Sequence, residues 1–152
     1  MLDRQHIGKV LSRVTRTVEA GRLRFFLDVI GDRQAARADP SSDPGSDRGL
    51  RVPPTYLFCL EMMDDPEPLA WLTDIGVNLL YILHGQQRFD YHAPAFAGDR
   101  LSFDATITDI YDKKGGALQF VVKQTQVRNQ DDRRVATLST TVVYREPVAR
   151  AA

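Results

Sequence analysis

The second half of the chain alternates apolar and polar residues over four long runs. From about Leu80 onward, Phe89 and Tyr91 alternate with polar neighbours, and the same period of two returns in 101–107, 118–122 and 134–144. This period is typical of strands with one buried face. The breaks between the runs, "APAFAGD", "DKKGG" and "NQDD", are typical of turns. Because the connections are short, we expect four strands in an antiparallel meander.

The first half predicts one strand and two helices. Residues 7–18 are rich in β-branched side chains and favour a first strand. The next segment places an apolar stripe at helical spacing, with Gly31 as the expected C-terminal cap; the stripe consists of Leu23, Phe26, Leu27 and Ile30. In "TYLFCLEMM", residues 55–63, only Glu61 is polar after Thr55, the expected N-cap. A buried strand is the rival interpretation, but the unbranched Leu and Met residues favour a helix buried on most sides.

These elements predict a single α+β domain over residues 1–152. A nearly all-apolar helix and a sheet with one apolar face are buried together most simply when the sheet wraps around the helix. That arrangement is the hot-dog fold. The stretch 38–54 is crowded with Asp, Pro, Ser and Gly, and we expect a flexible surface loop there without apolar anchors.

Composition narrows the classes of function. The chain has 152 residues with 20 basic and 20 acidic side chains, so no net field attracts nucleic acid or acidic lipid. The single cysteine, Cys59, excludes an internal disulfide and a multi-cysteine zinc site. No apolar run is long enough for a membrane span, and the first residues do not resemble a signal peptide. We therefore expect a cytoplasmic protein with neither a nucleic-acid nor a membrane partner.

The residues between about Ile7 and Tyr144 resemble the N-terminal MaoC-like (FAS1-like) dehydratase family. The resemblance lies in "HGQQRFDYHAPAFAGDRL", the upstream "VPPTYLF" and the "RLRFFLDVIGD" segment. It implies a hot-dog fold and hydration of trans-2-enoyl thioesters, or the reverse dehydration of 3-hydroxyacyl thioesters. The acyl chain would be carried on coenzyme A or on the phosphopantetheine of acyl carrier protein, with no other cofactor. It also implies a homodimer or heterodimer, with the active site between two units.

The resemblance also points to site residues, and the chain departs from the pattern at the catalytic dyad. Active relatives carry Asp-x-Asn-Pro-x-His after the first helix, whereas this chain has "DRQAAR". Asp32 is retained, but Arg37 replaces the histidine, and a guanidinium has no lone pair to accept a proton. We expect Pro54, Thr55 and Tyr56 at the substrate, with the last two donating backbone N–H groups to the thioester carbonyl. Gly85 and Gln86 are expected at the substrate as well.

Several of these residues also have a purely structural interpretation. His84 is a candidate base or hydrogen-bond donor, but it could equally anchor the start of a strand. His92 is expected to be structural, Cys59 to lie in the core, and Asp32 to serve either a turn or the chemistry. No metal is expected, because no cluster has ligand spacing. Four functions remain open: a half-catalytic hydratase unit, a self-sufficient homodimeric hydratase, an acyl-thioester binding protein and a thioesterase.

Overall fold

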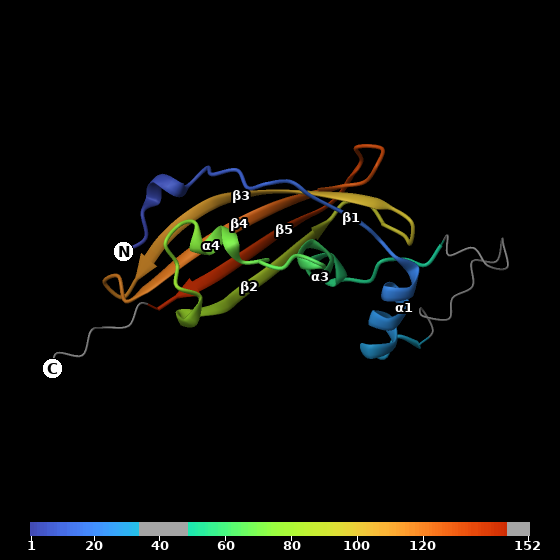
Figure 1. The fold of residues 1–152 in the computed structure, drawn as a ribbon, viewed down its shortest axis with the longest axis horizontal. Helices are drawn as coiled ribbons and strands as arrows, with labels where there is room; N and C mark the ends of the chain where they lie inside the picture. The colour runs from blue at the N-terminus through green and yellow to red at the C-terminus, as the bar shows by residue number, and fades with distance from the viewer. Residues whose placement is uncertain (34–48, 146–152) are drawn as a thin grey trace.

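The protein is built on one antiparallel sheet of five strands. The structure is a computed structural model that describes residues 1–33 and 49–145. The sheet order is β1-β3-β4-β5-β2, and every neighbouring pair is antiparallel (Figure 1). The strands are β1 (Val14–Thr17), β2 (Ile82–Tyr91), β3 (Arg100–Lys113), β4 (Leu118–Arg128) and β5 (Arg134–Tyr144).

The predicted four-strand meander is correct for three strands and wrong for the fourth. β3, β4 and β5 follow one another through short turns, as the alternation indicated. β2 instead pairs with β5, for example Phe89 with Leu138, so residues 92–99 carry the chain to the far side of the sheet. The period of two identifies a strand but not its neighbour. In the described part of the chain, the other edge of β2 has no strand beside it.

The expected central helix is present as α3 (Tyr56–Met62), against one face of the curved sheet (Figure 1). Leu57 and Leu60 are buried in one cluster with Phe103 and Leu138 of the sheet. The outer face of α3 is less covered than expected, because Phe58 and Cys59 are half-buried. The prediction that Cys59 lies in the core is therefore wrong: the helix has a second, partly exposed side.

The first helix, α1 (Ala20–Val29), buries a narrower stripe than its spacing suggested. Leu23 and Leu27 are fully buried, whereas Ile30 is 52% exposed. Gly31 has φ +83°, the left-handed conformation expected of a glycine just past a helix end. The short helix α4 (Ala70–Thr73) packs on a second cluster through Leu72. The described residues also include two 3-10 turns, η1 (Arg4–His6) and η2 (Leu79–Tyr81).

Two further sequence predictions need correction or fall outside the structure. The first strand was expected over 7–18, but β1 covers only Val14–Thr17, with an isolated bridge from Val10 to Thr106. Most of the predicted loop lies outside the described residues. Its last part is anchored, contrary to expectation: Leu50 is 1% exposed in the core, and the Val52 N–H donates to the Ala95 carbonyl at 2.9 Å.

Candidate functional site

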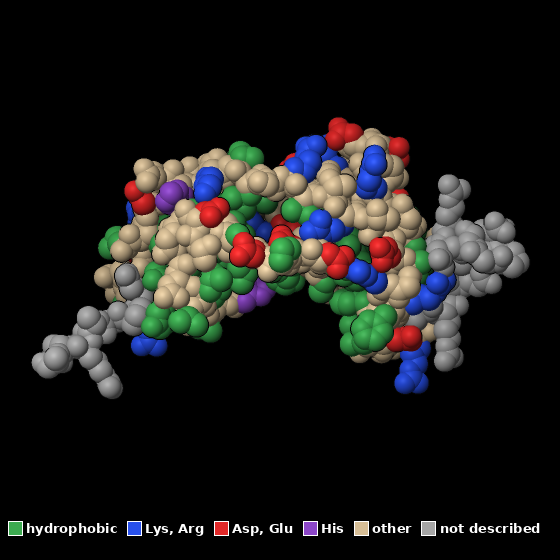
Figure 2. All heavy atoms as spheres, in the orientation of Figure 1, with side chains coloured by type: hydrophobic (Ala, Val, Ile, Leu, Met, Phe, Trp, Pro, Cys, Tyr) green, Lys and Arg blue, Asp and Glu red, His purple; other side chains and the backbone are tan. Residues whose placement is uncertain are grey.

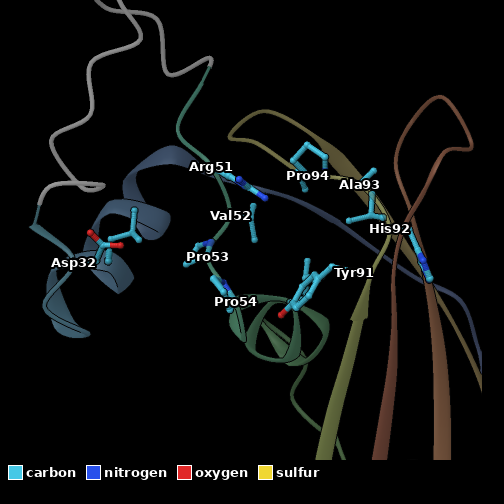
Figure 3. A pocket seen from close by; sticks show the side chains of 13 residues that line it. Asp32, Arg51, Val52, Pro53, Pro54, Tyr91, His92, Ala93 and Pro94 are labelled. Carbon is cyan, nitrogen blue, oxygen red and sulfur yellow. The ribbon is translucent and has the colours of Figure 1, made fainter.

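A cavity of about 550 Å³ lies at the N-terminal end of α3, between that helix, the end of α1 and the end of β2 (Figure 3). Its apolar wall includes Leu27, Leu57 and Val135. Four titratable side chains also line it, and these are Asp32, Arg51, Tyr91 and His92. The cavity thus combines a mainly apolar wall with a few polar groups, which is typical of a small-molecule site.

Asp32 reaches this cavity because α1 ends three residues earlier, at Val29. After Gly31 turns the chain, the Asp32 N–H donates to the Leu27 carbonyl at 2.9 Å and fixes the backbone. Figure 3 shows the Asp32 side chain on one side of the cavity, with Pro54 and Tyr91 on the other. The structure therefore brings two of the predicted site residues, Asp32 and Pro54, to one cavity. The partner positions Gln34 and Arg37 lie outside the described residues.

The start of α3 is arranged around the hydroxyl of Tyr91. Thr55 adopts φ 75° and makes no side-chain capping bond, so the expected hydroxyl cap is not formed. Its backbone N–H instead donates to Tyr91 Oη at 3.0 Å. The Tyr56 N–H donates to the Pro53 carbonyl at 3.4 Å. The Tyr91 oxygen thus occupies the position where the sequence predicts that a thioester oxygen accepts the Thr55 N–H.

The side chain of Tyr56 is buried in the protein, whereas its backbone N–H lies at the start of α3. It is 1% exposed, and its ring packs edge-on against Phe26 with 4.9 Å between the centroids. Among the described residues its hydroxyl has no hydrogen-bond partner. Burial raises the pKa of the Tyr56 phenol above its ordinary value, and the nearby Arg22 opposes that effect in part. Tyr56 is therefore held as the neutral phenol.

His92 lines the cavity, but its ring belongs to a hydrogen-bond chain across the sheet. Its Nε2 lies 3.0 Å from Thr137 Oγ1, and that hydroxyl donates its single proton to Gln126 Oε1 at 3.1 Å. Thr137 can therefore only accept from His92, which places the imidazole proton on Nε2. In Figure 3 the ring points away from the cavity. This geometry agrees with the structural role expected for His92.

The other predicted site residues lie at the opposite end of β2. His84 stacks on Phe58 of α3, with 5.3 Å between the ring centroids and 15° between the planes. Tyr91 lies seven positions further along, which is roughly 23 Å along a strand. Gly85 lies in a bulge of β2, and Gln86 is exposed beside it. None of these three lines the cavity within one chain. Whether they contact substrate stays a prediction.

Sequence reasoning missed two polar groups of the cavity, Arg51 and Tyr91. Arg51 stood in a stretch interpreted as a loop, and Tyr91 in a motif interpreted only as a strand. The "VPPTY" segment beside Arg51 was the available signal, since it already marked the start of α3. Within the described residues, no three His, Cys, Asp or Glu side chains gather to hold a metal ion. No described helix is long and apolar enough to cross a membrane.

Comparisons with known proteins agree with this architecture. The model of the FAS1-like, dehydratase domain region matches residues 5–138. A UPF0336 protein of Saccharopolyspora erythraea is 29% identical over 95% of this chain and 92% of its own. The HadBC (3R-hydroxyacyl-ACP dehydratase) complex of Mycobacterium tuberculosis superposes with TM-score 0.71 and 25% identity, covering 91% of this chain and 96% of that one. A MaoC-like dehydratase of Rhodospirillum rubrum has the same fold, with TM-score 0.64, 19% identity, and 93% and 94% covered.

The family match extends over most of the sheet, α1 and α3. It includes the "VPPTY" segment and the β2 motif that carried the resemblance in the sequence. The five-stranded antiparallel sheet with α3 against one face is the expected hot-dog arrangement. The chain therefore belongs to the family of FAS1-like dehydratase domain regions.

Proposed function

We propose that this chain is one unit of an enoyl-thioester hydratase, equivalently a 3-hydroxyacyl-thioester dehydratase, and that a second hot-dog chain supplies its missing base. The observation that carries the proposal is the polar lining of the cavity. Asp32 is a carboxylate at its wall, whereas the imidazole of His92 points away from it and is bonded to Thr137. The described lining therefore offers one carboxylate and no imidazole that faces the cavity, whereas the resemblance implies an Asp/His pair for the reaction.

The reaction makes three demands on such a site. A base must take a proton from water, an acid must protonate the α-carbon, and hydrogen-bond donors must stabilise the enolate-like oxygen. Asp32 can hold or activate the water, and the Thr55 N–H can donate to the oxygen once Tyr91 is displaced. Arg51, at the same cavity, is suited to the phosphates of coenzyme A or phosphopantetheine. No further cofactor is needed for this chemistry.

The outer edge of β2, which pairs with no strand among residues 1–33 and 49–145, supports a partner. An edge strand with free backbone groups is a template for pairing with another chain. Leu83 of β2 is 69% exposed, and Leu80 of η2, just before the strand, is 84% exposed, so apolar side chains are available for contact with a partner (Figure 2). HadBC, to which the chain is similar, is a dehydratase complex. We infer that a second hot-dog chain, identical or different, adds to β2.

The test is hydration of crotonyl-CoA, followed as loss of the enoyl absorbance. The purified chain alone should give little turnover. Turnover should appear after it is mixed with a MaoC-like subunit that carries an intact Asp-x-Asn-Pro-x-His sequence. Full activity of the chain alone, with a solution mass of a homodimer, would instead establish the self-sufficient enzyme.

A second candidate function is acyl-thioester binding without turnover. The same observation favours it, since one carboxylate without a paired imidazole can bind and orient a substrate but not complete both proton transfers. Calorimetric binding of butyryl-CoA, with no turnover in any mixture, would establish it. Release of free thiol from butyryl-CoA would identify a thioesterase instead.

A further inference from the structure

The hydroxyl of Tyr91 lies where the cavity meets the start of α3. Tyr91 is the last residue of β2, and it lines the cavity while its side chain stays 49% exposed. Its Oη accepts the Thr55 N–H at 3.0 Å, and Figure 3 shows its ring between the end of β2 and the start of α3. A hydrogen-bond donor at the proposed substrate cavity is thus occupied by a residue of the same chain.

The Thr55 N–H takes its acceptor from another element of the fold. Thr55 has φ +75°, a left-handed conformation that a β-branched residue rarely adopts. Its own hydroxyl makes no capping bond to α3. Among the described residues, the acceptor of this N–H is the Tyr91 hydroxyl. The N–H is therefore free to take a different acceptor whenever that hydroxyl leaves.

The Tyr91 ring can leave at little cost. Half of the side chain is already exposed, and the ring stacks on the neighbouring Phe89 with 5.8 Å between the centroids and 5° between the planes. A displaced hydroxyl can bond to water, so the exchange gives up one hydrogen bond and returns another. An oxygen that carries developing negative charge is also a stronger acceptor than a neutral phenol. A thioester oxygen in the proposed reaction therefore competes well for the N–H.

We propose that Tyr91 is a gating residue: its hydroxyl holds the Thr55 N–H while the cavity is empty and yields it to the carbonyl oxygen of an incoming acyl thioester. The inference rests on the proposed function, which supplies the thioester. A ligand with that oxygen displaces Tyr91, whereas a ligand without it leaves the hydrogen bond intact. Because the bond must open first, Tyr91 lowers the apparent affinity for thioesters in proportion to the open fraction of the protein.

Two ligands and one substitution test the gate. Butyryl-CoA carries the carbonyl oxygen, whereas S-butyl-CoA has the same chain length and carrier joined by a thioether. Tyr91→Phe keeps the ring and removes the hydroxyl. In calorimetry on the chain, Tyr91→Phe should bind butyryl-CoA about twofold to tenfold more tightly than the wild type, because the N–H no longer has to be released from one hydrogen bond. S-butyl-CoA should bind both proteins equally.

Tyr111→Phe is the matched control. Tyr111 stacks on Phe120 and does not line the cavity, so this variant should bind both ligands as the wild type does. Weaker binding of butyryl-CoA by Tyr91→Phe, or an equal gain for S-butyl-CoA, overturns the gate. Equal binding of butyryl-CoA by Tyr91→Phe and the wild type overturns the gate alone. If neither protein binds butyryl-CoA, the acyl-thioester site itself is contradicted, and the gate with it.

Nuclear magnetic resonance on the wild type gives a test that needs no variant to fold. The amide resonance of Thr55 should shift more with saturating butyryl-CoA than with saturating S-butyl-CoA, because the first ligand replaces its hydrogen-bond acceptor. Equal shifts with the two ligands would overturn the gate.

Discussion

Replacing Lys123 alone by methionine should destabilise the protein far more than replacing Lys123 and its partner Glu61 together. The two side chains are 9% and 7% exposed, and their charged atoms lie 2.7 Å apart between β4 and α3. In Lys123→Met, Glu61 stays buried with Thr125 as its remaining donor. Breaking a buried pair in this way costs roughly 3–5 kcal/mol. For a chain of this size that is a fall in Tm of about 6–20 °C.

The double variant Glu61→Leu/Lys123→Met is the control. It removes both charges and fills the space with apolar atoms, so its free energy of unfolding should lie within about 1 kcal/mol of the wild type or above it. Urea unfolding should be followed by far-UV circular dichroism, because Lys123 Nζ lies 5.4 Å from the centre of the Trp71 ring and its loss alters the emission. A Lys123→Met protein within 1 kcal/mol of the wild type would refute the burial argument.

Three other substitutions test the remaining features. Asp32→Asn should cost little turnover in the mixed complex if the partner supplies the whole Asp/His dyad, and a loss of about a hundredfold would show that Asp32 takes part in the acid–base chemistry. Tyr56→Phe should be neutral or stabilise by up to about 1 kcal/mol, because the lost hydroxyl is buried without a partner. Burial raises the pKa of that phenol in the folded protein, so above about pH 10 the unfolded chain loses this proton while the folded chain keeps it. This group therefore leaves the free energy of unfolding unchanged below about pH 10 and lowers it above that pH. Wild-type stability should therefore fall more than that of Tyr56→Phe between about pH 8 and pH 11, and equal falls would contradict this. Gly85→Ala should cost roughly 1–3 kcal/mol in urea unfolding, because the added Cβ meets Val143 Cγ2 at 2.7 Å; Gly21→Ala, with open space around it, should cost nothing.

The strands and both main helices could be predicted because their patterns are local. The alternation in 134–144 coincides with β5, and the apolar run after Pro54 coincides with α3. The neighbour of β2 could not be predicted, because the period of two is the same whichever strand lies beside it. The extent of burial also depends on distant segments. Ile30 continues the apolar stripe of α1 but is 52% exposed, whereas Leu50 is buried although it stands in a polar stretch.

The candidate site was predictable only where a motif marks a position in the chain. Asp32 and Pro54 reach the same cavity because Asp32 follows the end of α1 and Pro54 precedes α3. His84 and Tyr91 belong to one motif, yet they lie near opposite ends of β2 because the extended backbone of the strand holds them apart. Glu61 was visible as the polar residue of an apolar helix, but its partner is 62 positions away, beyond the reach of any local pattern.

The measurement that tests the account most directly is the rate of crotonyl-CoA hydration by the chain alone and after mixing with a MaoC-like subunit of intact Asp/His sequence. The account predicts a low rate for this chain alone. It predicts a rate about a hundredfold higher for the mixture, an increase typical of restoring an acid–base group. Hydration by this chain alone at the rate of the mixture, or a mixture no faster than its parts, would contradict the proposed division of labour.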